Sequence, residues 1–276
     1  MAEVITERIS RYVLDGDDDD LRRLLRIAQV TSQEARTAFD RVGIREGWRA
    51  IDCGCGPIGA LAEMADMVGP SGRAVGVDFN EPALERARAV VEALGLENVE
   101  LVAGDIYQID PTSLGDRFDL AFTRCFLMHQ PDPVRALGQI TTFVRPGGWV
   151  VAHEPLPTPP PRSYPHLAAL ASYWEIVHET MELGGASPQA VESLARSAPV
   201  VGLDVVRTGG FFTTLAPRLG FDLHAATLAA VRERAIKMGI PPTRIDNVAQ
   251  DLRAAREGGY EWVSTPFFLG LEFRKP

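Results

Sequence analysis

The segment Arg49–Gly59 constrains the fold more than any other part of this sequence. It reads RAIDCGCGPIG: a short apolar run leads into three closely spaced glycines, and a helical pattern follows over Ile58–Met67. A buried strand that passes through a glycine-rich turn into a helix is the arrangement of a nucleotide-cofactor site. The spacing of Gly54, Gly56 and Gly59 fits dinucleotide-binding folds, so a dehydrogenase has to be weighed first.

Asp52 argues against a dinucleotide at this turn. It lies two residues before the first glycine, and we expect its carboxylate to point at the turn. A pyrophosphate normally binds there on backbone N–H groups and a helix N-terminus, and two negative charges would repel each other. S-adenosylmethionine (SAM) carries a sulfonium and an α-ammonium where dinucleotides carry phosphate. Asp52 therefore favours SAM.

Acidic residues also follow the next two apolar runs. The second run ends at Asp78, where a carboxylate can accept both hydroxyls of a ribose, in SAM and NAD alike. We expect the neighbouring Phe79 to pack on an adenine face. The third run, Val99–Ala103, is followed by Asp105 and Ile106, which places an acceptor near an adenine amino group. These residues suit an adenosine-containing cofactor at the ends of the strands.

With a fourth apolar run over Phe118–Thr123 and a fifth over Trp149–Ala152, residues 47–155 resemble the class I SAM-dependent methyltransferases. The resemblance is to their small-molecule, UbiE-like branch. The segments that carry it are Asp52–Gly56, Asp78, Gly104–Asp105, Phe118–Leu120, His129–Pro133 and Arg145–Gly148. It implies an α/β fold with a Rossmann-like, seven-stranded, mostly parallel sheet flanked by helices, and SAM over the carboxyl ends of the first strands.

The resemblance also implies roles for individual residues. Gly54 and Gly56 would approach the methionine part of SAM, Asp78 would hold the ribose, and Asp105 with Ile106 would flank the adenine. The chain departs from the family pattern at Pro57, which we expect to be the first helical residue, where no N–H is needed.

The amino-terminal segment is similar to the part of these enzymes that folds over the methionine end of SAM. The tyrosine and the helical glutamine of that part correspond to Tyr12 and Gln29. A second interpretation is an amphipathic helix that begins near Leu21, after a capping Asp20, and packs on the sheet edge.

Composition indicates an ordinary enzyme rather than a nucleic-acid-binding protein. The formal net charge is −9, and only two residues are lysines. This balance disfavours a phosphate-backbone partner. The chain also has no apolar signal core near its start and no membrane-spanning stretch, so we expect a cytoplasmic protein. Cys53 and Cys55 lack a second ligand pair, and we expect no metal.

The pattern predicts four segments. Residues 1–47 form an amino-terminal helical lid, residues 48–155 the SAM-binding core, residues 156–200 a helical substrate lid, and residues 201–276 the completion of the sheet with a helical insertion. A proline-rich connector from Pro155 leads to predicted helices over Leu167–Leu183 and Pro188–Ser197. The remaining extended runs, expected to pair antiparallel, are Asp204–Thr214 and Glu261–Arg274, with helices between them over His224–Met238 and Ile245–Arg256.

The acceptor side of the site offers several polar candidates. His153 and Glu154 follow the fifth strand, so either is a candidate base for an oxygen or nitrogen nucleophile, and His129 follows the fourth strand. His153 also suits a structural role, and His129 an anchor of its loop. Arg124 is a candidate contact for the methionine carboxylate, or an ion-pair partner for nearby aspartates.

The sequence thus predicts a SAM-dependent methyltransferase that acts on a small organic acceptor, with S-adenosylhomocysteine as the second product. We expect substrate selection in the predicted lid and insertion, whose aromatic residues include Tyr173, Trp174, Phe211, Phe212 and Phe221. Two alternatives stay open at this point: a regulatory or binding protein that keeps SAM as a ligand, and a cyclase on the same fold.

Overall fold

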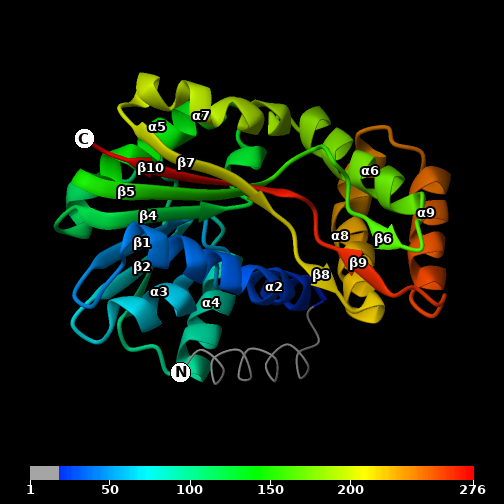
Figure 1. Cartoon of the computed structure of the whole chain (residues 1–276), viewed down its shortest axis with the longest axis horizontal. Coiled ribbons are helices and arrows are strands. Elements are labelled where there is room, and N and C mark those ends of the chain that lie inside the picture. Colours follow the sequence, from blue (N-terminus) through cyan, green and yellow to red (C-terminus); the bar gives the residue numbers. More distant parts are fainter. Residues whose placement is uncertain (1–18) are drawn as a thin grey trace.

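The computed structural model describes residues 19–276 and is built around a mostly parallel sheet of seven strands (Figure 1). β10 runs antiparallel to both of its neighbours, β5 and β7, whereas the other neighbouring pairs are parallel. The predicted sheet and its antiparallel closing pair are confirmed. In spatial order the strands are β3 (Val99–Ala103), β2 (Arg73–Asp78), β1 (Arg49–Cys53), β4 (Phe118–Arg124), β5 (Val144–Pro155), β10 (Phe268–Arg274) and β7 (Asp204–Phe211).

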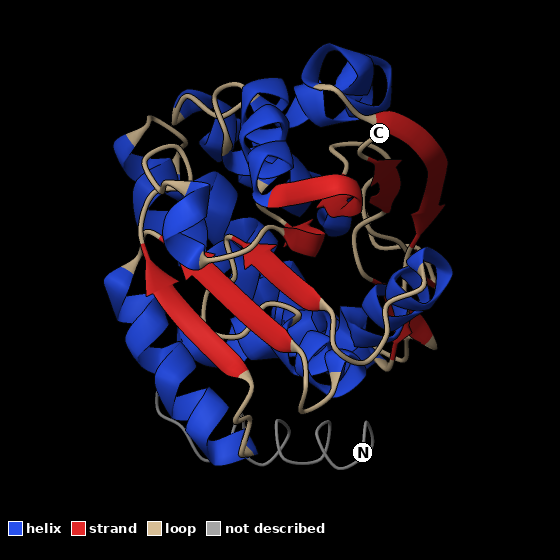
Figure 2. Ribbon diagram, turned by 90° about the vertical axis from the view of Figure 1, so that its left-hand side faces the viewer, coloured by secondary structure: helices blue, strands red, loops and turns tan. Residues whose placement is uncertain are grey.

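Helices cover both faces of this sheet (Figure 2). Successive strand residues point to opposite faces, so Ala50 packs with the helices of one layer and Ile51 with those of the other. The first layer contains α2 (Asp19–Val42), α3 (Leu61–Val68) and α4 (Glu81–Leu94), and the second contains α5 (Pro133–Phe143) and the short α7 (Leu194–Ser197). Short 3₁₀ turns are η1 (Pro111–Leu114), η2 (Leu127–His129), η3 (Pro188–Ser193) and η4 (Ala198–Val201).

A further group of helices lies beyond the carboxyl ends of the parallel strands, on the right of Figure 1. It has its own buried cluster, which includes Tyr173, Trp174 and Phe221. Its elements are α6 (Ala169–Leu183), α8 (Pro217–Lys237), α9 (Pro242–Ala255) and a small sheet in the order β6 (Ser163–Tyr164), β9 (Trp262–Ser264), β8 (Thr214–Leu215). The sequence pattern did not predict this small sheet. Pro266, which has no N–H to donate, separates β9 from β10 within the run predicted as one strand.

Several predicted boundaries are wrong by a few residues. α3 begins at Leu61 rather than Ile58, and Pro57 lies in the preceding turn instead of the helix, because Gly59 takes φ +53°. α2 has already begun at Asp19, so Asp20 lies inside the first turn and pairs with Arg23 instead of capping the helix. Residues 145–148 form a bulge within β5, because Val144 pairs with Phe118 and Trp149 with Leu120.

The segment Pro188–Val201 packs against α5 and against η2, the turn that follows β4. Its residues Val191, Leu194 and Ala198 share a buried cluster with Leu137 of α5. Of the two helices expected to form the substrate lid, α6 belongs to the helical group beyond the strand ends, whereas Pro188–Val201 completes the core beside α5. Within residues 19–276, no helix combines the length and apolar character needed to cross a membrane.

Candidate active site

A cleft of about 830 Å³ lies between the carboxyl ends of the strands and the helices α2, α6 and α8. We call its two parts the glycine half and the helical half. The glycine half is lined by residues of the turns after β1, β2 and β4, which include Asp52, Gly54, Gly56, Asp78, Phe79 and Arg124. The helical half is lined by residues of α2, η2, α6 and α8, which include Arg23, His129, Trp174, Thr227, Val231 and Arg234. The cleft thus connects the predicted cofactor turn with the helices beyond the sheet.

The three glycines of the turn are required for different reasons. Each has a positive φ: +80° at Gly54, +54° at Gly56 and +53° at Gly59. A Cβ at Gly54 would overlap the ring of Phe126, and one at Gly59 would overlap the Asp52 carboxylate. A Cβ at Gly56 would meet no atom within 4 Å and would occupy space in the cleft. Gly56 therefore leaves room for a ligand to approach the backbone.

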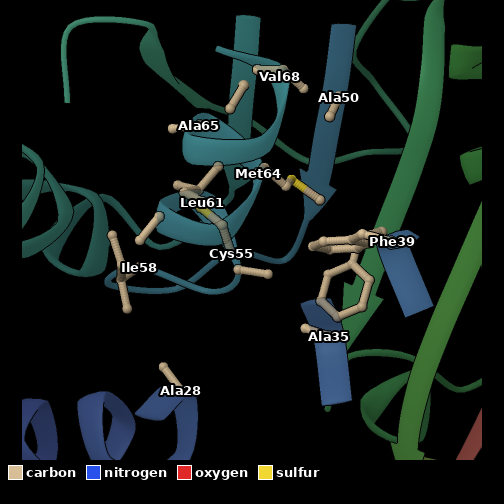
Figure 3. Packing of buried hydrophobic residues seen from close by; sticks show 14 of the residues in the cluster. Ala28, Ala35, Phe39, Ala50, Cys55, Ile58, Leu61, Met64, Ala65 and Val68 are labelled. Atoms are coloured by element: carbon tan, nitrogen blue, oxygen red, sulfur yellow. The ribbon is translucent and has the colours of Figure 1, made fainter. Parts of the chain in front are cut away.

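Packing beneath the turn holds it in place. Cys55 and Ile58, on the turn, belong to a buried cluster with Leu61 and Met64 of α3. Ala28 of α2 belongs to the same cluster (Figure 3). Ile58 is 1% exposed. The side chains of Cys55 and Ile58 thus anchor the turn to the core, while its glycines face the cleft.

Asp52 faces the cleft from the end of β1. Its side chain is buried, and Oδ2 accepts a hydrogen bond of 2.7 Å from the backbone N–H of Ala60. Burial raises the pKa of Asp52 to about 7, although the Ala60 N–H and the Arg124 guanidinium lower it. A cation bound in the glycine half would stabilise the ionised carboxylate.

Asp78 faces the same half from the end of β2. Its Oδ2 accepts from the Gly56 N–H at 2.8 Å, and its Oδ1 accepts from the Asn80 N–H at 2.9 Å. A carboxylate has about four acceptor positions, so both oxygens can accept further hydrogen bonds from ligand hydroxyls. The ring of the adjacent Phe79 is 78% exposed and available for stacking.

Arg124 supplies a donor in an otherwise acidic half. Its Nη2 donates to the Gly59 carbonyl at 2.7 Å, whereas its buried Nη1 has no hydrogen-bond partner in the described part of the chain. Arg124 pairs with neither nearby aspartate: Asp119 accepts from Arg145, and Asp132 caps α5. The unpaired Nη1 is suited to a carboxylate.

The polar groups of the glycine half match those of SAM. Asp52 and Asp78 offer acceptors for an ammonium and for ribose hydroxyls, Arg124 offers a donor for a carboxylate, and Gly56 leaves the space. Residues 44–206, more than half of the chain, match the family model of the methyltransferase domain.

The chain belongs to the methyltransferase domain family. This membership confirms the resemblance to class I methyltransferases and SAM as the cofactor. The chain is 35% identical over 160 residues to a protein of transposon TN4556 from Streptomyces fradiae, covering 58% of this chain and 45% of that protein. It is 30% identical over 156 residues to the demethylmenaquinone methyltransferase of Lactococcus lactis, covering 56% of this chain and 61% of the enzyme.

The chain thus spans about half the length of the curated relatives it matches. Its fold is also that of a coclaurine N-methyltransferase crystallised with N-methylheliamine and S-adenosylhomocysteine, with a TM-score of 0.54 and 17% identity. That alignment covers 91% of this chain and 73% of the other. The likeness supports the Rossmann-like methyltransferase fold.

Three of the described residues that were predicted to bind the cofactor do not line the cleft. Asp105 accepts from the Tyr107 N–H at 3.0 Å, and Ile106 is buried in the core beside α5. Gln29 is absent from the cleft lining, although its neighbours in α2 contribute. Tyr12 lies outside the described residues. Asp105 nevertheless follows β3 beside Asp78, because the Gly104 N–H donates to the Asp78 carbonyl at 2.9 Å.

His153 does not reach the cleft, contrary to the sequence-based prediction. Its ring is 2% exposed and lies between Phe122 and Phe211, with ring centroids 5.3 and 4.9 Å away. Burial, followed by the charges of Arg124 and Arg41, lowers its pKa to about 3. The ring is neutral and enclosed, which fits the structural role.

Glu154 is also enclosed, on the opposite face of β5. Its carboxylate accepts from the backbone N–H groups of Phe126, Leu127 and Met128 at 3.1, 3.0 and 3.2 Å. Burial raises its pKa to about 7 against the effect of these three donors. Glu154 is therefore a positioning residue that holds the loop after β4, and not a base within the cleft.

His129 is the one candidate base that the structure places in the cleft. Its side chain is exposed to the cleft at the end of η2, beside the loop that Glu154 holds. The surrounding protein, then the cations Arg234 and Arg23, and then His178 lower its pKa to about 4. The ring is therefore neutral near pH 7, and its low pKa makes it a weak base in the ligand-free protein.

The helical half contains residues that sequence reasoning missed. Arg23, Thr227 and Arg234 line it, and the helical spacing of Thr227 and Arg234 with Leu223 was the available signal. Trp174 lines the cleft as expected, and its Nε1 donates to the Leu156 carbonyl at 2.9 Å.

Three of the aromatic residues expected to select the substrate do not line the cleft. Phe211 stacks on Phe268, and Phe221 packs against Tyr260 in the core of the helical group. Phe212 is 53% exposed and does not line the cleft. Aromatic content alone could not separate the cleft wall from the core behind it.

Proposed function

We propose that the protein transfers the methyl group of SAM to a small organic acceptor. The observation that carries this proposal is the continuity of the cleft, which joins the acidic glycine half to the largely apolar helical half in one space of about 830 Å³. A volume of this size suits a cofactor together with a small substrate. The demethylmenaquinone methyltransferase activity of a relative supports a small acceptor.

The residues of the glycine half would hold SAM. Asp52 would face its cationic groups, Asp78 its ribose hydroxyls, and Arg124 its carboxylate. When bound, SAM supplies an electrophilic methyl group on a sulfonium.

The helical half would orient the acceptor and exclude water. Trp174, Val177 and Leu223 give this half an apolar wall, and positioning in a dry pocket can supply much of the rate of a direct displacement. His129 would accept the proton that an oxygen or nitrogen nucleophile loses. Its neutral ring meets the first requirement of a general base.

Incubation with methyl-labelled SAM tests the proposal. The protein would be supplied with phenols, amines, carboxylic acids and polyketide-like acceptors, and mass spectrometry would follow labelled product and S-adenosylhomocysteine. We expect transfer to at least one acceptor class. Tight binding of SAM with no labelled product across the panel would contradict the proposal and favour a binding protein, and conversion of an acceptor without label would favour a cyclase.

A further inference from the structure

The ionisable residues divide the cleft by charge. The glycine half contains two carboxylates, Asp52 and Asp78, and one guanidinium, Arg124. Among residues 19–276, those that line the helical half include two guanidinium groups, Arg23 and Arg234, and one carboxylate, Asp20. SAM, which carries two cationic groups, suits the first half. The second half has an excess of positive charge that the cofactor does not need.

Arg23 is fixed by an acid of its own helix. Its Nε and Nη2 donate to Asp20 Oδ1 at 3.0 and 2.7 Å, and its side chain is 15% exposed. A single oxygen of Asp20 thus holds two of the five N–H donors of the guanidinium. The group is oriented and retains donors.

Arg234 reaches the cleft from α8, and none of the described acidic residues pairs with it. Its guanidinium lies against Gly184, where the Cβ of any other residue would overlap it. Between residues 19 and 276, no carboxylate or carbonyl oxygen accepts a hydrogen bond from this side chain. A planar guanidinium that lies against backbone and lines a cleft is suited to bind a carboxylate through two hydrogen bonds.

His129 lines the same half of the cleft as the two guanidinium groups. The charges of Arg234 and Arg23 also contribute to the low pKa of this ring, after its burial and ahead of His178 of α6. The two arginines come from α2 and α8, elements that are far apart in the sequence. Most of the other residues that line this half are apolar, with contributions from Leu24, Val177, Met181, Leu223 and Val231.

We infer that the acceptor is an apolar molecule with an anionic group, a carboxylate in the simplest case, which binds between Arg234 and Arg23 beside His129. This inference rests on the proposed function, because it names the substrate class of the same cleft. Such an anion would offset the two cations and raise the pKa of His129. The bound acceptor would thereby make its own base more basic.

Binding of matched acids and amides tests the inference independently of turnover. Benzoate, 2-naphthoate and biphenyl-4-carboxylate, each with its primary amide, would be titrated by calorimetry into protein saturated with S-adenosylhomocysteine. We expect at least one acid to bind about tenfold to a hundredfold more tightly than its amide. Equal affinity within all three pairs, or binding of none of the acids, would overturn the inference.

Variants of α8 identify the residue responsible. Arg234→Gln should reduce the affinity of the preferred acid to that of its amide, whereas Arg218→Gln, an exposed arginine of the same helix outside the cleft, should leave it unchanged. An Arg234→Gln protein that keeps the preference would overturn the inference, provided that its melting temperature matches the parent.

A second readout follows the imidazole of His129 by NMR. Its pKa should rise when the preferred acid binds and should not change with the amide, and an unchanged pKa with the bound acid would count against the assignment. Because this experiment needs no methyl transfer, failure of the proposed methyltransferase activity would remain distinguishable from failure to bind an anion.

Discussion

The Asp78 carboxylate accepts a hydrogen bond from the backbone N–H of Gly56, with an oxygen–nitrogen distance of 2.8 Å. This contact joins the acid at the end of β2 to the glycine turn after β1. It orients the carboxylate toward the cleft and reduces the freedom of a glycine that has a positive φ. Two sequence motifs that lie more than twenty residues apart thus form one binding surface.

Gly56→Ala should reduce SAM affinity more than it reduces stability. The added methyl meets no protein atom within 4 Å, so the main cost to the fold is the left-handed backbone, about 1–2 kcal/mol. The same methyl group would project into the part of the cleft where we expect SAM to bind. We therefore expect at least a tenfold rise in the Kd of SAM, measured by calorimetry.

Gly202→Ala is the matched control for that variant. Gly202 has φ +75°, also meets no atom within 4 Å, and lies outside the cleft. Both variants should lower the melting temperature by similar amounts, but Gly202→Ala should bind SAM like the parent. Equal SAM affinity for the two variants would remove Gly56 from the cofactor site.

SAM affinity should rise with pH through about 7. In the free protein the pKa of Asp52 is raised to about 7, so part of the protein carries a neutral carboxyl near neutrality. A cationic ligand prefers the carboxylate, and binding should release protons. The gain between pH 6 and pH 8 should be up to about tenfold. Calorimetry in two buffers with different ionisation enthalpies measures both effects. Asp52→Asn should abolish the pH dependence of SAM affinity. If SAM binding to the parent protein released no protons, the prediction would be contradicted.

Asp52 and Glu154 should each contribute stability to the ligand-free protein that is lost as pH rises from about 4 to about 7. Burial raises the pKa values of both groups to about 7, above their ordinary values near 4. At these two groups the folded state binds more protons than the unfolded state in this window, whereas His153, whose pKa is lowered by burial, acts in the opposite direction. The contribution of Glu154 is isolated by comparison with Glu154→Gln: in thermal unfolding, the parent should lose stability relative to the variant as pH rises across this range. A difference between the two proteins that does not change with pH would contradict this assignment.

His129 and His153 should respond differently to substitution. His129→Gln should lower turnover by about 100-fold to 10,000-fold with little change in SAM affinity, because it removes the proton acceptor that lines the cleft. His153→Leu should change turnover by less than about threefold and act on stability instead, since the ring packs between two phenylalanines. Measurement of kcat at saturating acceptor separates them. The reverse ranking would restore His153 as the base.

Much of the sheet and the glycine half could be predicted from the sequence. The period of apolar runs, the glycine spacing and the acids at strand ends are local signals, and each depends on a backbone geometry that few residues permit. Asp52, Gly56 and Asp78 line the cleft as expected. The boundary of α3 was missed because the left-handed conformation of Gly59 delays the helix, which residue type alone does not show.

The helical half could not be predicted to the same extent. Which face of β5 or α8 meets the cleft depends on long-range packing, so His153 and Glu154, adjacent in sequence, are enclosed by different elements. Pro188–Val201 has the composition of a lid but packs on α5, because its apolar residues complete that core. The only local signal for Arg234 was its helical spacing with Leu223 and Thr227, which does not show what that face of α8 meets. The packing of α8 against α6 and α2 decides that this face lines the cleft.

Calorimetric titration of SAM into the parent, Asp78→Ala and Asp132→Ala proteins tests the central assignment most directly. Asp132 also accepts a backbone N–H, that of Arg135 at 3.0 Å, but caps α5 away from the cleft. Loss of charge-assisted hydrogen bonds to the ribose should weaken SAM binding by about 1.5–3 kcal/mol in Asp78→Ala, roughly a 10-fold to 150-fold rise in Kd. Asp132→Ala should bind SAM like the parent. A parent protein that does not bind SAM, or an Asp78→Ala protein that binds it equally well, would contradict the account.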